Sequence, residues 1–432
     1  MAGRQTSGRS HSAGRTLAAS LLVLFVAGWI ASALQTSGGR VHVQSIKIPT
    51  QNGQWVVADL FKPRSATADS PAPFIAVVPG FQRSKEALSN IALELARRGF
   101  VTASIDPYAQ GSSSASLSRI AATTEGYGLF ALVDYVASSE NLNYIDKNRI
   151  GATGHSAGGN AAIRAANYFG REAQRTGEPS KLDSVYVSGY VLTLRDDVLG
   201  DVRSNVGVAY ALYDEGAYRN ELGNGDMRTA PEALRAVNSG LSAEDAVSVV
   251  EIGRYYGDKD ARTLRIVHNE RVLHPFQPYM QEATANQIEY FEQVFDWSGE
   301  LSSYDQVWQW KEFFGVVSLI AALVALVPMG QLLLRTTWFS GLVKTVPNPL
   351  PRPAGKGRQL FWGTFVLSAL VACFTYIPMA ELSQKLFVAA STRQLTWFFP
   401  QRMNNAVMLW ALLNGTFGFL VFWLTYRFFG RT

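Results

Sequence analysis

The sequence contains very little cysteine. Among its 432 residues there is one, Cys373, and it lies inside an apolar run. A disulfide within the chain is therefore excluded, and so is a metal site built from cysteine ligands. The sequence also lacks an H-E-x-x-H pattern, which marks zinc hydrolases. It predicts neither a metal ion nor a cofactor.

Acidic residues are nearly absent from both ends of the chain. Residues 35–312 hold 26 Lys/Arg and 33 Asp/Glu, a net charge of −7, whereas the remainder holds 13 Lys/Arg and one acid, Glu381. The overall charge of +5 therefore comes from the ends. A nucleic-acid-binding domain needs a basic face. Because the middle of this chain is acidic, we expect no nucleic-acid partner.

Four apolar runs are each close to the roughly 20 residues that a helix needs to cross a bilayer. They are residues 17–34, 313–334, 360–380 and 405–428. We predict four transmembrane helices at these positions. The long stretch between the first two, residues 41–300, is left for a folded domain. The spans hold few ionisable residues, which argues against a permease with an ion pathway.

The charges beside these runs predict sidedness. Residues 1–16 and the loop 335–359 are basic and hold no acid, which is typical of cytoplasmic segments. The loop 381–404 has mixed charge and is expected outside. We therefore predict a multi-pass protein of the cell membrane with its large domain outside the cytoplasm. Residues 17–34 are alternatively a cleaved signal peptide, because residues 31–33 resemble a cleavage site, and the domain is exported in either case.

Strand patterns alternate with helix patterns along the predicted domain. The predicted strands are 41–48, 56–60, 74–78, 101–105, 149–153, 185–194, 206–212 and 264–267, and the predicted helices are 87–98, 125–138, 157–169 and 283–295. The first two strands are expected to form a hairpin around Asn52-Gly53. Alternating strands and helices form a mostly parallel sheet with helices on both faces. The predicted fold class is therefore α/β, with an added transmembrane helical region.

One G-x-S-x-G pattern lies between a predicted strand and a predicted helix. It consists of Gly154-His155-Ser156-Ala157-Gly158. A tight turn from strand to helix needs small neighbours, which explains the two glycines, and it lifts the serine hydroxyl out of the carboxyl edge of the sheet. The pattern alone is weak evidence. Its position between the two elements makes Ser156 the candidate nucleophile.

The end of the first buried strand is the expected place for an oxyanion hole. An acyl-transfer enzyme must aim backbone N–H groups at the oxygen that becomes negative. The segment here is Val77-Val78-Pro79-Gly80-Phe81. We expect the donors to be the N–H groups of Phe81 and Ala157.

Five histidines are available as a general base: His11, His42, His155, His268 and His274. His11 lies in the predicted cytoplasmic tail, and His42 precedes the sheet. His155 is the variable residue of the serine turn and is expected to point away from the hydroxyl. His268 belongs to a predicted strand, where a packed or hydrogen-bonded role is expected. His274 follows that strand, at the sheet edge where a base must sit, and is favoured over His268.

The acid that orients the base should follow another strand. Asp214 comes after the predicted strand 206–212 and is the first choice, with Glu215 as the second. Asp258 and Asp260 are alternatives with no clear strand before them. The excess chain around 218–260 is expected to be a lid or a substrate-binding insertion.

The order Ser156, Asp214, His274 resembles the α/β-hydrolase superfamily, whose triad runs serine, acid, histidine. Residues 79–86, and residues 98–112 with Asp106, are similar to its esterase, dienelactone-hydrolase and serine-peptidase branches. The similarity covers about residues 41–298. Pro79 stands where those branches usually have histidine, which is a departure in the oxyanion loop.

The resemblance implies a serine hydrolase that cleaves a carboxylic ester or amide through an acyl-enzyme. The apolar runs outside it predict that this hydrolase is anchored in a membrane. The expected partners are a small-molecule or lipid acyl substrate and the membrane. The alternative is a non-catalytic, hydrolase-like binding or accessory domain on a multi-span membrane protein. Fold alone does not choose the substrate.

Overall fold

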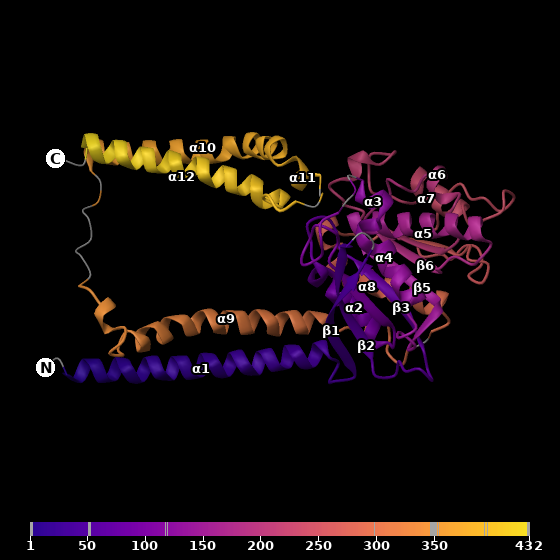
Figure 1. The fold of residues 1–432 in the computed structure, drawn as a ribbon, viewed down its shortest axis with the longest axis horizontal. Coiled ribbons are helices and arrows are strands. Elements are labelled where there is room, and N and C mark those ends of the chain that lie inside the picture. Colours follow the sequence, from indigo (N-terminus) through magenta and orange to yellow (C-terminus); the bar gives the residue numbers. More distant parts are fainter. Residues whose placement is uncertain are drawn as a thin grey trace. The chain divides into compact units, whose positions relative to one another are not determined.

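The computed structural model describes residues 3–50, 53–116, 118, 120–297, 299–345, 352, 354–392, 394 and 396–429. The chain forms two compact units. One unit consists of Met1–Ser114 with Ile120–Gly341, and the other of Ala115–Arg119 with Leu342–Thr432. The first unit holds the sheet (Figure 1).

An eight-stranded sheet organises the first unit, with strand order β1-β2-β4-β3-β5-β6-β7-β8. The strands are β1 (Val41–Pro49), β2 (Trp55–Pro63), β3 (Ala72–Val78), β4 (Val101–Ile105), β5 (Ile145–His155), β6 (Ser184–Ser188), β7 (Asn205–Ala209) and β8 (Arg265–His268). Strand β2 pairs antiparallel with β1 and with β4, and all other pairs are parallel. This mixed, mostly parallel sheet has the α/β-hydrolase order, which confirms the predicted fold class.

Helices cover both faces of the sheet. The helices of this domain are α2 (Ser89–Arg97), α3 (Ala121–Thr124), α4 (Leu129–Ser138), α5 (Ala157–Thr176), α6 (Asp196–Leu199), α7 (Pro231–Asn238) and α8 (Gln281–Val294). Strand β3 shows the two-sided burial: Phe74 and Ala76 belong to the core under α4 and α5, and Ile75 and Val77 to the core under α2 and α8. Burial on both faces explains why this strand is a continuous apolar run.

Two predicted strands were too long. Strand β6 ends at Ser188, not at 194, and β7 ends at Ala209, not at 212. The chain turns away at Gly189, whose φ is 64°. Val191 and Leu194, beyond that turn, are nevertheless buried in the core. These two residues are apolar because they are buried in a loop. A short apolar run in the sequence looks the same whether it forms a buried loop or a buried strand.

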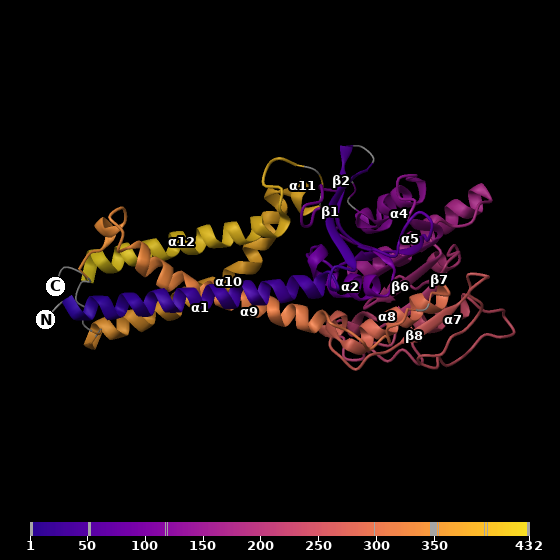
Figure 2. The ribbon, with the colours of Figure 1, turned by 90° about the horizontal axis from the view of Figure 1, so that it is seen from below.

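Four helices are long and apolar enough to cross a membrane. They are α1 (Gly3–Gln35), α9 (Trp308–Leu333), α10 (Gly355–Leu386) and α12 (Arg402–Phe429), with the short α11 (Val388–Ser391) between the last two. Within the first unit α1 packs along α9, and the hydroxyl of Ser318 donates to the carbonyl of Leu24 at 3.2 Å (Figure 2). Within the second unit α10 packs along α12, and Trp410 Nε1 donates to the carbonyl of Ala372 at 2.9 Å.

The helices extend beyond the four apolar runs. Helix α1 begins at Gly3, within the predicted basic tail 1–16, and α10 runs from Gly355 to Leu386, into both neighbouring loops of the prediction. Asn52, part of the predicted hairpin turn, lies outside the described residues.

Candidate active site

Ser156 lies at the turn between β5 and α5, with φ 59° and ψ −117°. This region of backbone space is nearly closed to residues with a side chain, and a residue held there is strained. The Ser156 N–H donates to the carbonyl of Ser188 at 2.8 Å, which ties the turn to the end of β6. The turn has the strained strand-to-helix geometry that the G-x-S-x-G pattern predicted.

The glycines of this turn are required by close backbone contacts. A Cβ added at Gly158 would lie 1.9 Å from the carbonyl oxygen of Val78, and one at Gly154 would lie 2.4 Å from the carbonyl carbon of Gly158. Real Cβ atoms do not approach so closely, so only glycine fits at either position. The contacts bring the start of α5 against the end of β3, where the predicted oxyanion loop begins.

His274 and Asp214 are brought together from loops after β8 and β7. Nδ1 of His274 is 2.7 Å from Oδ2 of Asp214, and the Asp214 side chain is only 4% exposed. Burial by itself would raise the pKa of Asp214. The hydrogen bond and charge of His274 and the N–H of Gly216, 2.6 Å from Oδ1, outweigh it and lower that pKa. The carboxylate therefore stays charged beside the imidazole ring.

The other candidate acids have different partners. Oε2 of Glu215 accepts a hydrogen bond from the backbone N–H of His274 at 3.2 Å, so Glu215 contacts the main chain of that residue. Asp258 accepts from the N–H of Asp260 at 2.7 Å inside its own turn. Within the described part of the chain, Asp214 is thus the candidate acid whose carboxylate contacts the His274 ring.

His268 is a buried strand histidine. Its Nδ1 lies 2.8 Å from the hydroxyl of Tyr186, and burial lowers its pKa to about 4. It does not line the cavity described next. The packed role expected from the sequence agrees with this position.

A small cavity of about 170 Å³ is lined by Ser156, His274 and Asp214 together. Its other lining residues are Tyr127, Ala157, Asn160, Gly189, Tyr190, Val191, Leu192, Tyr210, Arg219 and Asn220. Of the predicted insertion 218–260, only the first residues reach the cavity. Helix α7, farther along it, packs against β7 and β8 and is not a lid.

The predicted oxyanion donors lie on two segments beside Ser156. Ala157 is the first residue of α5 and lines the cavity. A Cβ added at Gly80 would lie 3.3 Å from Cβ of Ser156, so the loop after β3 runs directly past the serine. Phe81 is the next residue in that loop, and its side chain is exposed.

His155 is the residue whose place the sequence reasoning missed. Its ring packs against the ring of His274, with centroids 4.6 Å apart and the planes inclined by 41°. Burial, together with the charge of His274, lowers the pKa of His155 to about 3, so the ring is neutral. Its position at the end of β5 was the available signal, because that end faces the loop after β8.

A chain of buried polar groups continues from His155. Nε2 of His155 and Oε1 of Gln277 are both buried and both lie beside Gly189, where the two side chains interact. Gln277 Nε2 donates to Glu270 at 2.9 Å, and Asn286 donates to the same carboxyl at 2.9 Å. Burial nevertheless raises the pKa of Glu270.

The described residues hold no group of three or more His, Cys, Asp or Glu side chains that could bind a metal ion. The chemistry that the cavity offers is a hydroxyl on a strained turn, an imidazole paired with a charged carboxylate, and nearby backbone N–H groups.

Comparison with known families agrees with the fold. Residues 29–216 match the family model described as "PETase: PET hydrolase-like". The match covers less than half of the chain and includes Ser156 and Asp214 but not His274. No curated protein matches the sequence significantly. The domain thus has the α/β-hydrolase fold and matches a hydrolase family model, as the resemblance implied.

Solved structures similar to this chain include several hydrolases. An esterase from Pyrococcus furiosus is 13% identical, with a TM-score of 0.41 over 61% of this chain and 96% of its own. A hyperthermophilic esterase from Pyrobaculum calidifontis is 18% identical, with a TM-score of 0.40 over 66% and 92%. A putative dienelactone hydrolase from Klebsiella pneumoniae is 16% identical, with a TM-score of 0.39 over 59% and 98%. At such low TM-scores, no activity is carried over from these proteins.

Proposed function

We propose that this chain is a membrane-anchored serine hydrolase that cleaves a carboxylic ester or amide. The observation that supports this most is the shared cavity, in which Ser156 on its strained turn meets a His274–Asp214 pair joined at 2.7 Å. A surface serine on a glycine-rich turn would have neither the strained backbone nor the paired imidazole.

The reaction would run through an acyl-enzyme. Nε2 of His274 takes the Ser156 proton as the oxygen attacks the substrate carbonyl carbon, and Asp214 stabilises the imidazolium. The backbone N–H groups of Phe81 and Ala157 would receive the negative oxygen. His274 then gives the proton to the leaving alcohol or amine. Water, deprotonated by the same imidazole, attacks the acyl-enzyme and releases the acid and the free serine.

The size of the cavity favours a short acyl group. Pockets for drug-sized ligands are typically about 300–1,000 Å³, whereas this one is about 170 Å³. Its lining residues include three tyrosines, two asparagines and Arg219. We therefore expect polar esters with small acyl groups to react faster than long-chain lipid esters. The description of the matching family model as PET hydrolase-like supports hydrolysis and by itself does not choose between an ester and an amide.

The four apolar helices would hold the domain at a membrane. The basic segments beside the spans support a cytoplasmic N-terminus and a domain outside the cytoplasm. Anchoring by α1 and α9 then joins both ends of the domain to the bilayer, because α1 leads into β1 and α9 follows α8.

Labelling with a fluorophosphonate probe tests the nucleophile. The full-length protein in detergent should be labelled, and Ser156→Ala should abolish the labelling. Ser112→Ala is the matched control, because Ser112 is exposed and its hydroxyl has no role in the mechanism. Asp214→Asn should lower kcat on a short-chain ester about 10⁴-fold.

Two results would contradict the proposal. Labelling that survives Ser156→Ala would show that another residue is the nucleophile. A well-folded protein that neither reacts with the probe nor hydrolyses any short-chain ester would favour the non-catalytic binding domain instead.

A further inference from the structure

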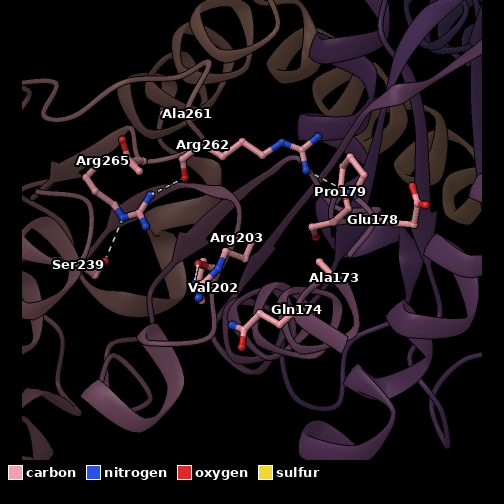
Figure 3. Close-up of a pocket in the computed structure, with 12 residues that line it drawn as sticks. Ala173, Gln174, Glu178, Pro179, Val202, Arg203, Ser239, Ala261, Arg262 and Arg265 are labelled. Carbon is pink, nitrogen blue, oxygen red and sulfur yellow. Dashed lines mark hydrogen bonds between the residues drawn. The ribbon is translucent and has the colours of Figure 1, made fainter. Parts of the chain in front are cut away.

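A second cavity lies at the opposite edge of the sheet from Ser156. It has a volume of about 480 Å³ and is lined by segments that precede β6, β7 and β8, with residues near the C-terminal ends of α5 and α7 (Figure 3). The amino ends of parallel strands lie at the edge away from the catalytic loops, which follow the carboxyl ends. This cavity is therefore separate from the one that holds Ser156.

Three arginines line the cavity, against one carboxylate. The arginines are Arg203, Arg262 and Arg265, and the acid is Glu178. In Figure 3, Glu178 lies at the far side from Arg265. Arg262 is neutralised by Asp183, 3.0 Å from its Nε, and its Nη1 donates to the carbonyl of Ser180 at 2.7 Å.

Arg265 carries a buried positive charge. No carboxylate in the described part of the chain forms an ion pair with it. The residue is only 2% exposed. Its Nε donates to the hydroxyl of Ser239 at 3.1 Å, and its Nη1 to the carbonyls of Ser204 and Leu264 at 3.1 Å and 2.9 Å. These neutral oxygens bind N–H groups without neutralising the charge. Nη2 has no hydrogen bond to any described residue, so donors remain for a further acceptor.

Arg203 contributes a second unpaired guanidinium to the same cavity. Its Nη1 donates to the carbonyls of Gly200 and Val202 at 2.9 Å and 2.8 Å, and no carboxylate of the described chain forms an ion pair with it. Arg203 also lines a neighbouring hollow of about 550 Å³ and is exposed. Two guanidinium groups with free donors, one buried and one exposed, thus line the same cavity.

We propose that this cavity binds a phosphate group between Arg265 and Arg203. A buried unpaired cation is expensive, and an anion that enters beside it recovers much of that cost. Guanidinium groups match the oxygens of phosphate in geometry and charge. A tetrahedral anion also presents oxygens in several directions, so it can accept from two guanidinium groups at once. The phosphate can be inorganic or belong to a lipid headgroup, and the chemistry at the two arginines is the same.

Binding of inorganic phosphate to the full-length protein in detergent tests the site. Isothermal titration should be carried out at constant ionic strength, with chloride as the reference anion. We expect wild type to bind one phosphate and Arg203→Ala to bind at least about tenfold more weakly, because a charge-assisted hydrogen bond is lost. Arg265→Lys should show a similar loss. If that variant fails to fold, Arg203→Ala still decides the result, because Arg203 is exposed.

Arg254→Ala is the matched control, since it removes an exposed arginine that pairs with Glu251 outside the cavity. The proposed site is supported if Arg203→Ala binds phosphate more weakly than wild type while Arg254→Ala binds it with unchanged affinity. A second arm replaces free phosphate by nanodiscs containing phosphatidic acid or only phosphatidylcholine. If the protein binds nanodiscs with phosphatidic acid but does not bind free phosphate, and Arg203→Ala abolishes this binding, the site is supported and the phosphate comes from a lipid headgroup.

Two outcomes would overturn the proposal: no binding in either arm, or equal weakening by Arg203→Ala and Arg254→Ala, which would indicate a general effect of charge. Ester hydrolysis by Arg203→Ala should equal that of wild type, because Arg203 lies at the other edge of the sheet.

Discussion

Replacing Ser156 by glycine should stabilise the protein while it removes the proposed nucleophile. The residue has φ 59° and ψ −117°, where a side chain is strained by about 1–3 kcal/mol. Glycine relieves this strain, but its greater freedom in the unfolded chain costs about 0.4–1 kcal/mol. The net gain over Ser156→Ala should be about 1 kcal/mol, because alanine also lacks the hydroxyl but keeps the strain.

The comparison should be made by thermal unfolding of the two full-length variants in one detergent. For a domain of this size, about 1 kcal/mol corresponds to a rise of about 2–4 °C in the unfolding midpoint. Ser138, at the end of α4, provides the control, since its backbone is helical. There the glycine variant should melt below the alanine variant. If Ser156→Gly melts at or below Ser156→Ala, the turn is not strained and the reasoning fails.

Three further predictions concern packing, acidity and topology. Gly158→Ala should lower the free energy of unfolding by about 3 kcal/mol or more in urea, because its Cβ would lie 1.9 Å from the last carbonyl oxygen of β3; a wild-type midpoint would contradict this. Burial lowers the pKa of His155 to about 3 and of His268 to about 4, so below pH 6.5 the unfolded chain binds protons that the folded chain excludes. Stability should therefore fall as the pH is lowered, by about 2 kcal/mol per histidine between pH 7 and 5, and His155→Gln should remove half of that slope; an unchanged slope would refute the shift. A single cysteine at Ser112, in a Cys373→Ser background, should react with a membrane-impermeant maleimide on intact cells, whereas labelling only after permeabilisation would place the domain inside.

Much of the fold could be predicted because its signals are local. Strand β3 is buried on both faces, so its whole sequence is apolar. The G-x-S-x-G pattern around Ser156 lies within five residues of the chain, so the serine turn could be predicted, although the close contact that requires Gly158 is with Val78 on β3. The strand lengths of β6 and β7 could not be predicted, because Val191 and Leu194 are buried in a loop and carry the same apolar signal as a strand.

The candidate site could be predicted from the sequence where a residue follows a strand, and not where a contact depends on packing between loops. His274 and Asp214 were selected because each follows a parallel strand whose carboxyl end reaches the same edge. The contact of His155 with His274 was not expected, because the direction of a side chain at the end of a strand depends on how the strand twists and on what packs above it. The same holds for the polar chain through Gln277 and Glu270, whose members lie far apart in sequence from His155.

The sequence by itself determined the class of fold, the four apolar helices and the serine turn, since periodicity, run length and the G-x-S-x-G pattern are all readable in continuous segments of the chain. The tertiary structure decided the 2.7 Å contact between residues 60 positions apart, the tilted packing of the two imidazole rings, and the position of Arg265, whose charge no described carboxylate pairs. These features depend on which residues, distant in sequence, come into contact in the low-dielectric interior. The local sequence around each residue does not specify those contacts.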